Sequence, residues 1–339
     1  MGGRRYENDE ITPQGPDPRR LSNFQKMLAH LLKQPLLATT QITLAAASLI
    51  SGRLTMTASP ELLDTLITGI ESGDIIPYLG PNALDGVTEK TSGNPIPADS
   101  DSLILAMNKG QPMAPRLMYE FPRAAMNLEN KKGRKFIERF LTETYADKQW
   151  TTSRLHQWLA ERSIPYIIDI NRDTQLQQAW ADRPHVLICG IARLTGQDFR
   201  YRIYQYQSGE YKEVSADQAD VTLPILFKPM GTPLPDPNFV ASDADYVDYI
   251  TELMGGFAIP PFLKEYRPGK QYLFMGLRMT RDTERMVLSD IIYAAGEPAG
   301  WVLLPNATDK EKRFCDKKNL VIVDADWTEL LDKQVAEAV

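Results

Sequence analysis

The sequence predicts an α/β fold with a Rossmann-like, mostly parallel sheet and helices on both of its faces. Short apolar segments such as 75–79 and 165–170 end in glycine or polar residues, as buried strands do. Amphipathic segments with helix-capping residues alternate with them along the chain. Such alternation is typical of a parallel sheet, and here a helical insertion and a small β-hairpin excursion interrupt it.

The composition excludes several classes of protein. Of the 339 residues, 43% are hydrophobic and 24% are charged, which suits a folded domain. The net charge of -6 argues against sequence-independent nucleic-acid binding, because that needs a basic face. Cys189 and Cys315 lack CxxC spacing and the three histidines are scattered, so no disulfide framework and no metal site is expected. A reducing, cytoplasmic location fits best.

Residues 1–55 differ from the rest and are expected to form a loosely structured N-terminal extension of an α/β domain at 56–339. The first 20 residues are rich in proline, glycine and charge, which is typical of disorder. No charge occurs between Lys33 and Arg53, but polar residues dilute this stretch. A membrane span needs about 20 predominantly apolar residues, so no span is predicted.

The first strand is predicted at 75–79, directly before Gly80-Pro81-Asn82. A helix precedes it, with Ser59 as N-cap, Pro60 at the first helical position and Gly73 at its end. A strand that stops at a glycine can present backbone N–H groups to a phosphate. The alternative is an ordinary turn after an ordinary strand.

A helical insertion is expected around residues 100–160. It follows a turn-rich loop over 82–101, and a loop of this length is more often functional than filler. Residues 116–145 are predicted as a helical region, anchored by aromatic residues and methionine, and residues 153–161 as a short helix. The first is also the expected place for a subunit contact.

The second buried strand is predicted at 165–171 and ends in Asn171-Arg172-Asp173, before a helix at 174–180. Ligands of open α/β sheets bind beyond the carboxyl ends of the strands, so Asn171 and Asp173 lie where a site is expected. Helix capping is the alternative role for these two side chains, and both roles are compatible.

The remaining elements continue the alternation. Strands are predicted at 185–192, 223–227, 271–276, 301–304 and 320–323, with a hairpin at 201–214. Helices are predicted at 242–254, 283–295 and 328–339. In the helix at 242–254, Val247, Ile250 and Met254 are the expected inward positions.

Four strand ends in succession resemble those of the sirtuin-like (silent information regulator-like) family of NAD-binding domains. They are Gly80-Pro81-Asn82, Asn171-Arg172-Asp173, Lys228-Pro229-Met230-Gly231 and Leu273-Phe274-Met275-Gly276. The similarity covers roughly residues 74–295 and is to the bacterial branch that lacks the zinc module. Members of that branch are often NAD-cleaving defence proteins, so the resemblance implies NAD or a related adenine nucleotide as ligand.

The resemblance also assigns roles to individual residues. Gly80, followed by Pro81 and Asn82, looks like the start of the phosphate-cradling turn of the family. Asn171 looks like the asparagine that contacts the nicotinamide ribose and is needed for glycosidic cleavage. Asp173 matches the aspartate two positions later. Gly276 looks like the glycine that approaches the adenosine half of the cofactor.

Departures from the family pattern point to a degenerate member. Met230, before Gly231, occupies the position of the catalytic histidine, and a thioether is no usable base. Asp169 replaces a threonine, and Asn82 replaces the second glycine of the first turn. Arg278, close after Gly276, is a candidate to bind phosphate bidentately, or else a surface arginine at a helix start.

These observations favour a domain that binds NAD or a related adenine nucleotide as a sensor or accessory protein and is weak or inactive as an enzyme. The first alternative is an NAD glycohydrolase with Asp169 or Asp173 as a relocated base, aided by Asn171. The second is a structural interaction protein without a ligand. The missing zinc lobe argues against protein deacylation. The sequence also resembles sirtuin-like proteins that are encoded among the nitrogen-fixation genes of bacteria. A homo-oligomer or a protein partner remains open.

Overall fold

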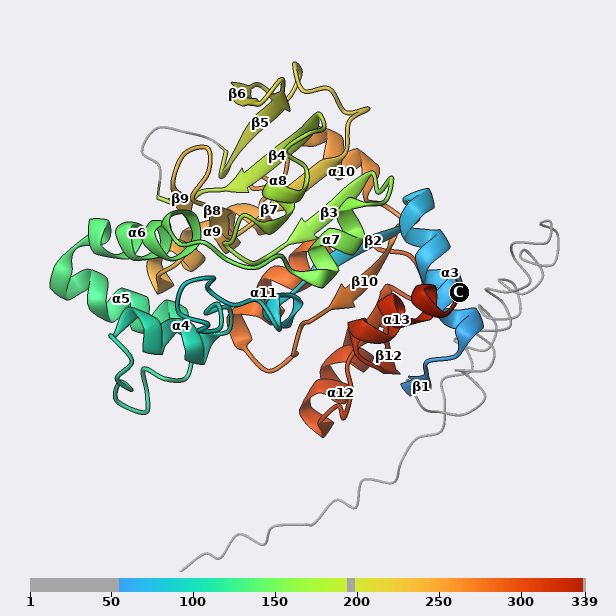
Figure 1. Cartoon of the computed structure of the whole chain (residues 1–339), viewed down its shortest axis with the longest axis horizontal. Helices are drawn as coiled ribbons and strands as arrows, with labels where there is room; N and C mark the ends of the chain where they lie inside the picture. The colour runs from blue at the N-terminus through green and yellow to red at the C-terminus, as the bar shows by residue number, and fades with distance from the viewer. Residues whose placement is uncertain (1–54, 194–198, 338–339) are drawn as a thin grey trace, which may run out of the picture. The chain divides into compact units, whose positions relative to one another are not determined.

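The computed structural model describes residues 55–193 and 199–337, with side chains of the last helix described up to residue 332 (Figure 1). The predicted extension at 1–55 therefore lies, apart from Thr55, outside the described residues. Among the described residues, none of the helices combines the length and apolar character that crossing a membrane requires.

The core of the described part is a ten-stranded sheet. Its centre is β2 (Ile75–Leu79), which pairs in parallel with β3 (Tyr166–Asp169) on one side and β10 (Gln271–Met275) on the other. Beyond β3 lie β7 (Ile225–Lys228), β4 (His185–Gly190), β5 (Tyr201–Gln207) and β6 (Glu210–Val214). Beyond β10 lie β11 (Gly300–Leu303), β12 (Leu320–Asp324) and β1 (Thr55–Thr57). Every pairing is parallel except those of the hairpin β5–β6, which confirms the predicted fold class and the predicted excursion.

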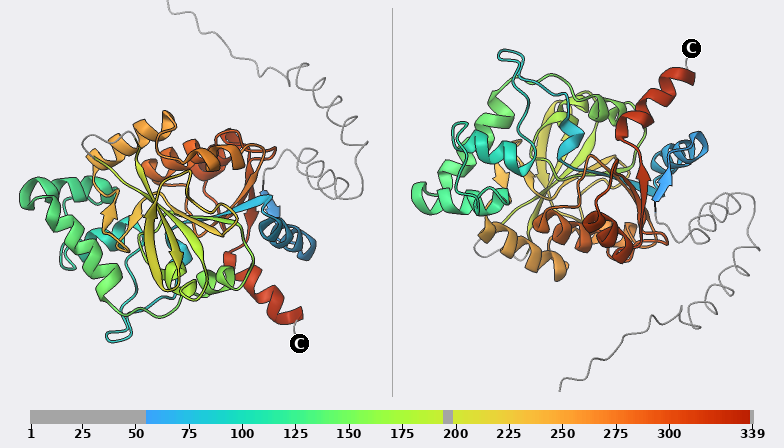
Figure 2. Two further views of the ribbon diagram at one scale, coloured as in Figure 1. Left: turned by 90° about the horizontal axis from the view of Figure 1, so that it is seen from above. Right: turned by 90° about the horizontal axis from the view of Figure 1, so that it is seen from below.

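Helices cover both faces of this sheet, as Figure 2 shows. On one face, α7 (Arg154–Ala160) packs against α8 (Gln175–Ala179) and α13 (Trp327–Glu337), and α13 also contacts α3 (Pro60–Ser72). On the other face, α9 (Asp243–Met254) packs against α11 (Asp282–Ile291). The helices α10 (Pro261–Tyr266) and α12 (Asp309–Lys317) complete the alternation.

The helix α3 forms where its end signals place it. The Ser59 side chain accepts a hydrogen bond from the backbone N–H of Leu62 at 3.2 Å, and Pro60 starts the helix. At the other end, Gly73 has a φ of 76°, a left-handed conformation that glycine adopts without steric cost. Both predicted ends of this helix are confirmed.

The inward face of α9 differs from the prediction. Val247 and Met254 are 69% and 73% exposed. The buried positions are Tyr246, Tyr249, Ile250 and Leu253, which form a stripe at helical spacing. The two tyrosine rings bury more surface than Val247 and Met254 would, so the helix is rotated to place the rings inside.

The helical insertion is confirmed, but its segments differ from the predicted ones. It comprises α4 (Ser100–Met107), α5 (Phe121–Lys132), α6 (Arg134–Thr142) and η2 (Glu143–Asp147). Gly133, with a φ of 85°, divides the helical region predicted over 116–145 into α5 and α6. The insertion has an apolar cluster of its own, which includes Ile104, Phe121 and Ile137.

The direction in which strands are added to the sheet reverses at β2, because β3 is added on one side of β2 and β10 later on the other. Open α/β sheets bind ligands beyond the carboxyl ends of strands at such a switch point. Here β2 runs into η1 (Pro81–Leu84), and β7 runs through Met230 into the small pair of β8 (Gly231–Thr232) and β9 (Asn238–Phe239).

Candidate functional site

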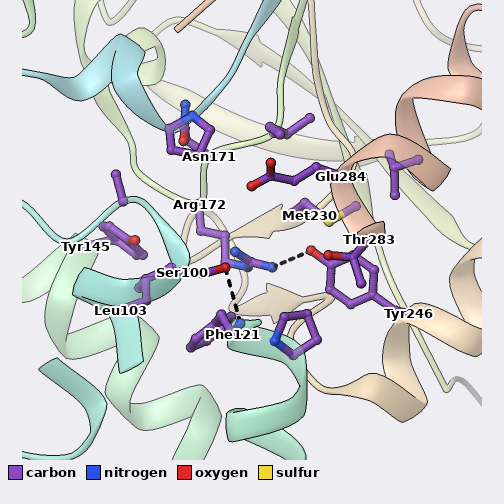
Figure 3. A pocket seen from close by; sticks show the side chains of 15 residues that line it. Ser100, Leu103, Phe121, Tyr145, Asn171, Arg172, Met230, Tyr246, Thr283 and Glu284 are labelled. Carbon is purple, nitrogen blue, oxygen red and sulfur yellow. Dashed lines mark hydrogen bonds between the residues drawn. The ribbon is translucent and has the colours of Figure 1, made fainter. Parts of the chain in front are cut away.

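A pocket lies at this switch point, between the carboxyl ends of the central strands and the helical insertion (Figure 3). Its cavity volume is about 30 Å³. Its lining residues come from η1, the insertion, the ends of β3 and β7, and the helices α9 and α11. They are Pro81, Ala98, Ser100, Leu103, Phe121, Pro122, Tyr145, Ile170, Asn171, Arg172, Met230, Tyr246, Thr283, Glu284 and Val287.

The structure brings three of the sequence-predicted site residues to this pocket. Pro81 enters from η1, Asn171 from the end of β3, and Met230 from the segment after β7. The other predicted residues do not line it, namely Gly80, Asn82, Asp169, Asp173, Gly231, Gly276 and Arg278.

The Asn171 side chain is held by groups next to the pocket. Its Nδ2 donates to the Gly80 carbonyl and to Oδ1 of Asp169, each at 2.9 Å. The same Asp169 oxygen accepts the backbone N–H of Asn171 at 3.0 Å. These bonds use the amide nitrogens, so Oδ1 of Asn171 is left to accept a hydrogen bond from a ligand hydroxyl.

Arg172, which the sequence reasoning did not select, extends its side chain into the pocket (Figure 3). Its guanidinium donates to the Val240 carbonyl and, at 3.2 Å, to the Tyr246 hydroxyl. It also lies 5.3 Å from the centre of the Phe121 ring. The side chain is buried, yet among the described residues it forms no ion pair with a carboxylate. The available signal was a basic residue directly after a buried strand.

Glu284 is the second lining residue that the sequence reasoning missed. It lies in the first turn of α11, the helix that follows β10, and points into the pocket in Figure 3. Burial raises the pKa of its carboxyl to about 8, with Glu120 and Asp99 adding to the rise and Arg281 and Arg172 opposing it. A carboxyl with a pKa near neutrality can act as a general acid or base.

Beneath the strand ends lies a second group of charges, formed by His156, Asp169, Asp173 and Lys228, which we term the buried ionic cluster. All four side chains are almost fully buried. The Lys228 ammonium lies 2.6 Å from Oδ2 of Asp169 and 3.8 Å from Oδ2 of Asp173. His156 Nε2 lies 3.7 Å from Oδ2 of Asp169, and its Nδ1 lies 2.7 Å from the Ser153 hydroxyl.

These contacts favour the charged forms of Asp169 and Lys228. Burial opposes ionisation of Asp169, but the Lys228 ammonium holds the pKa of that carboxyl well below its usual range. Burial likewise opposes the charge of Lys228, and Asp169 and Asp173 raise the pKa of the ammonium above its usual value. His156, Asp169 and Asp173 are close enough to share a metal ion. Since Lys228 already supplies the positive charge there, a metal ion would have to displace it.

The two predicted phosphate contacts are used within the fold. The Gly80 N–H donates to the Met275 carbonyl at 2.9 Å, and the Asn82 N–H donates to the Gly276 carbonyl at 2.8 Å. A Cβ on Gly276, which has a φ of 67°, would lie 2.2 Å from the backbone nitrogen of Ala83. These glycines therefore let the ends of β2 and β10 approach each other closely.

Arg278 is likewise directed away from the pocket. Its guanidinium donates to Glu311 at 2.9 Å and to the Pro305 carbonyl at 3.0 Å. Gly231 begins β8 and pairs with Phe239. Asp173 accepts the backbone N–H of Gln175 at 2.7 Å, although the N-cap position of α8 is occupied by Thr174.

Residues 165–323 match the family model of the SIR2-like domain. The matched range runs from β3 to β12 and contains Asn171, Arg172, Lys228, Met230 and Glu284. It begins after β2 and the helical insertion. No curated protein gives a significant match to the chain. Over these residues the chain is similar to the SIR2-like domain, which supports the predicted resemblance to the sirtuin-like family.

Proposed function

We propose that the pocket binds NAD or a related adenine nucleotide, and that the protein acts as a sensor or accessory protein with weak or no NAD cleavage. Asn171 carries this proposal, because its Oδ1 is free at the pocket while its amino group is fixed by Gly80 and Asp169. Such an acceptor suits a ribose hydroxyl. The match of residues 165–323 to the SIR2-like domain supports a nucleotide as the ligand.

Met230 supports weak or absent cleavage. Its side chain is buried and lines the pocket, in the position where the family resemblance implies a histidine. A thioether cannot take a proton from a ribose hydroxyl. Since general-base help is typically worth about 10²–10⁴-fold in rate, an enzyme without it would be slow.

Glu284 favours a second candidate function, an NAD glycohydrolase. The sequence suggested Asp169 or Asp173 as a relocated base, but both are buried outside the pocket lining and face the Lys228 ammonium. Glu284 lines the pocket, and its pKa of about 8 lets it exchange a proton near neutral pH. If NAD is cleaved, Glu284 is the residue that we propose as the base.

Isothermal calorimetry with NAD, followed by chromatography of the same sample for nicotinamide, separates the candidates. Heat with intact NAD would support the binding function, and Met230→His would then be expected to introduce cleavage. Released nicotinamide that disappears in Glu284→Gln would support the glycohydrolase. If the sample gives no heat and releases no nicotinamide, both candidate functions are contradicted and a structural interaction protein is favoured.

Asn171→Ala is the variant that tests the site itself. We expect it to weaken NAD binding about tenfold or more, since it removes a positioned hydrogen-bond acceptor. Asn108→Ala is the matched control, because the Asn108 side chain also donates to a backbone carbonyl, that of Gln111 at 2.7 Å, but does not line the pocket. Equal loss of binding in both variants would count against the proposed site.

A further inference from the structure

Several hydrogen-bond donors that line the pocket have no acceptor among the described residues. The Ser100 oxygen accepts the backbone N–H of Phe121 at 3.2 Å, and the Tyr246 oxygen accepts from Arg172 at 3.2 Å. Each of these hydroxyls therefore has its hydrogen available for another partner. Nη1 of Arg172 has no hydrogen-bond partner among the described residues. These three side chains face one another across the pocket in Figure 3.

The charge of Arg172 is also uncompensated by this part of the chain. Its partners are a carbonyl, a hydroxyl and an aromatic ring, none of which carries a full negative charge. Arg134, by contrast, bridges Asp245 and Glu129. A buried charge is costly unless it is paired and hydrogen-bonded. An anion bound in the pocket would supply the missing pair.

The backbone around the pocket contributes positive partial charge, as the Arg172 side chain contributes positive charge. The first turns of α4, α5 and α11 all contribute lining residues, including Ser100, Phe121 and Thr283. The N-terminus of a helix carries partial positive charge and favours anions. Glu284 is the acidic residue in the described lining, and with its raised pKa it is mostly protonated at neutral pH and does not repel an anion.

We infer that Arg172, Ser100 and Tyr246 together bind one oxyanion group of the ligand, a phosphate or a carboxylate. This deepens the proposed function and rests on it for the remainder of the ligand, a nucleotide held beside Asn171. Two parts of a dinucleotide can supply such a group: its pyrophosphate, or a carboxylate on the terminal ring. A planar guanidinium with free donors suits either.

Calorimetry with three probes tests the inference: NAD, nicotinic acid adenine dinucleotide and inorganic phosphate. The two dinucleotides differ only in that a carboxylate replaces the carboxamide of the terminal ring. Hydrogen bonds to charged groups contribute about 1.5–3 kcal/mol, so Arg172→Gln is expected to weaken oxyanion binding about 10- to 100-fold. Tyr246→Phe keeps the ring and removes one donor, and we expect it to weaken binding about 3- to 10-fold.

Arg183→Gln is the matched control. Arg183 also donates to a carbonyl, that of Arg162 at 3.3 Å, and lies 4.5 Å from the centre of the Trp180 ring. It lies just before β4, at the end of the sheet opposite the pocket, and does not line the pocket. Its substitution is expected to leave all three affinities within twofold, and the thermal melt of each variant reports whether it is folded.

The outcomes distinguish the two possible sources of the oxyanion, the pyrophosphate and the carboxylate. They also separate the oxyanion inference from the proposed nucleotide binding. If Arg172→Gln weakens both dinucleotides equally, the oxyanion is the pyrophosphate; if it weakens only the nicotinic acid form, the oxyanion is the carboxylate. Phosphate binding that Arg172→Gln abolishes, with neither dinucleotide bound, would sustain the inference and reject the proposed nucleotide. Unchanged affinities in folded Arg172→Gln and Tyr246→Phe would overturn the inference and leave nucleotide binding intact. Failure of all three probes to bind would overturn both.

Discussion

Two buried cations lie near the same edge of the sheet and differ in how their charge is compensated. Lys228, at the end of β7, contacts the carboxylates of Asp169 and Asp173 within the buried ionic cluster. Arg172, just after β3, meets only the Val240 carbonyl, the Tyr246 hydroxyl and an aromatic ring, and it reaches the pocket. The first charge is neutralised within the chain and holds strands together. We propose that a ligand neutralises the second.

The difference follows from what each strand end faces. The β3 and β7 strands pair in parallel, so Asp169 and Lys228 emerge side by side, and the cluster closes beneath Asn171. One residue beyond Asn171, the chain passes under the helical insertion, where Phe121 and Ser100 line a space that the fold does not fill. The charge of Lys228, paired within the buried ionic cluster, therefore stabilises the fold. The charge of Arg172, which reaches the pocket, is available for binding.

The largest effect is expected from removing the paired cation. Lys228→Met should destabilise the protein by about 3–5 kcal/mol, because Asp169 and Asp173 would remain buried without a counter-charge. Chemical denaturation at pH 7 measures this loss. Lys270→Met is the control, since Lys270 pairs with the exposed Asp74 at 3.1 Å and should cost less than about 1 kcal/mol. An equal loss of unfolding free energy in the two variants would contradict the distinction between the buried ionic cluster and a surface ion pair.

An intermediate change in the free energy of unfolding is expected from replacing Glu284 in the pocket. This change should stabilise the protein, whereas Lys228→Met should destabilise it. The Glu284 pKa of about 8 in the folded protein lies above the ordinary value of 4.5, so folding favours the protonated form. The free energy of unfolding should therefore fall as pH rises from about 4.5 to 8, and level off above that range. Glu284→Gln removes this loss and should stabilise the protein at pH 9 by an amount on the order of 2 kcal/mol, with little gain at pH 4.

Denaturation of both proteins across pH 4–9 gives the Glu284 contribution as the difference between the two curves. Glu265→Gln serves as control, because Glu265 is exposed on α10 and should leave the curve unchanged. A pH-independent difference between wild type and Glu284→Gln would contradict the raised pKa. It would also remove the support for Glu284 as a general base.

The smallest effect is expected from Arg278, which the sequence suggested as a phosphate ligand although it departs from the family pattern. Its side chain is 39% exposed and pairs with Glu311, which Thr308 also contacts. Arg278→Gln should therefore cost less than about 1 kcal/mol and change nucleotide affinity by less than twofold. Calorimetry beside Arg172→Gln measures this directly. A tenfold loss in Arg278→Gln would show that Arg278 turns into the site when ligand binds.

The sequence by itself predicted most strands of the sheet, their alternation with helices, and the sheet edge at which the candidate pocket lies. Apolar runs and helix ends are local signals, so the parallel sheet, the hairpin and both ends of α3 were predicted correctly. The rule that ligands bind beyond strand ends is a property of the fold class, and it led to Asn171, which lines the pocket, and to Asp173, which does not. Met230, which also lines the pocket, came from the family resemblance. Neither inference needed knowledge of a distant partner.

The tertiary structure alone decided which charged groups are sealed and which are available. Asp169 belongs to the buried ionic cluster because Lys228, 59 residues away, meets it. Glu284 and Arg172 line one pocket although 112 residues separate them. The exposure of Val247 depends on which face of α9 buries more surface. Such pairings follow from long-range packing, which the spacing of residues along a single segment does not encode.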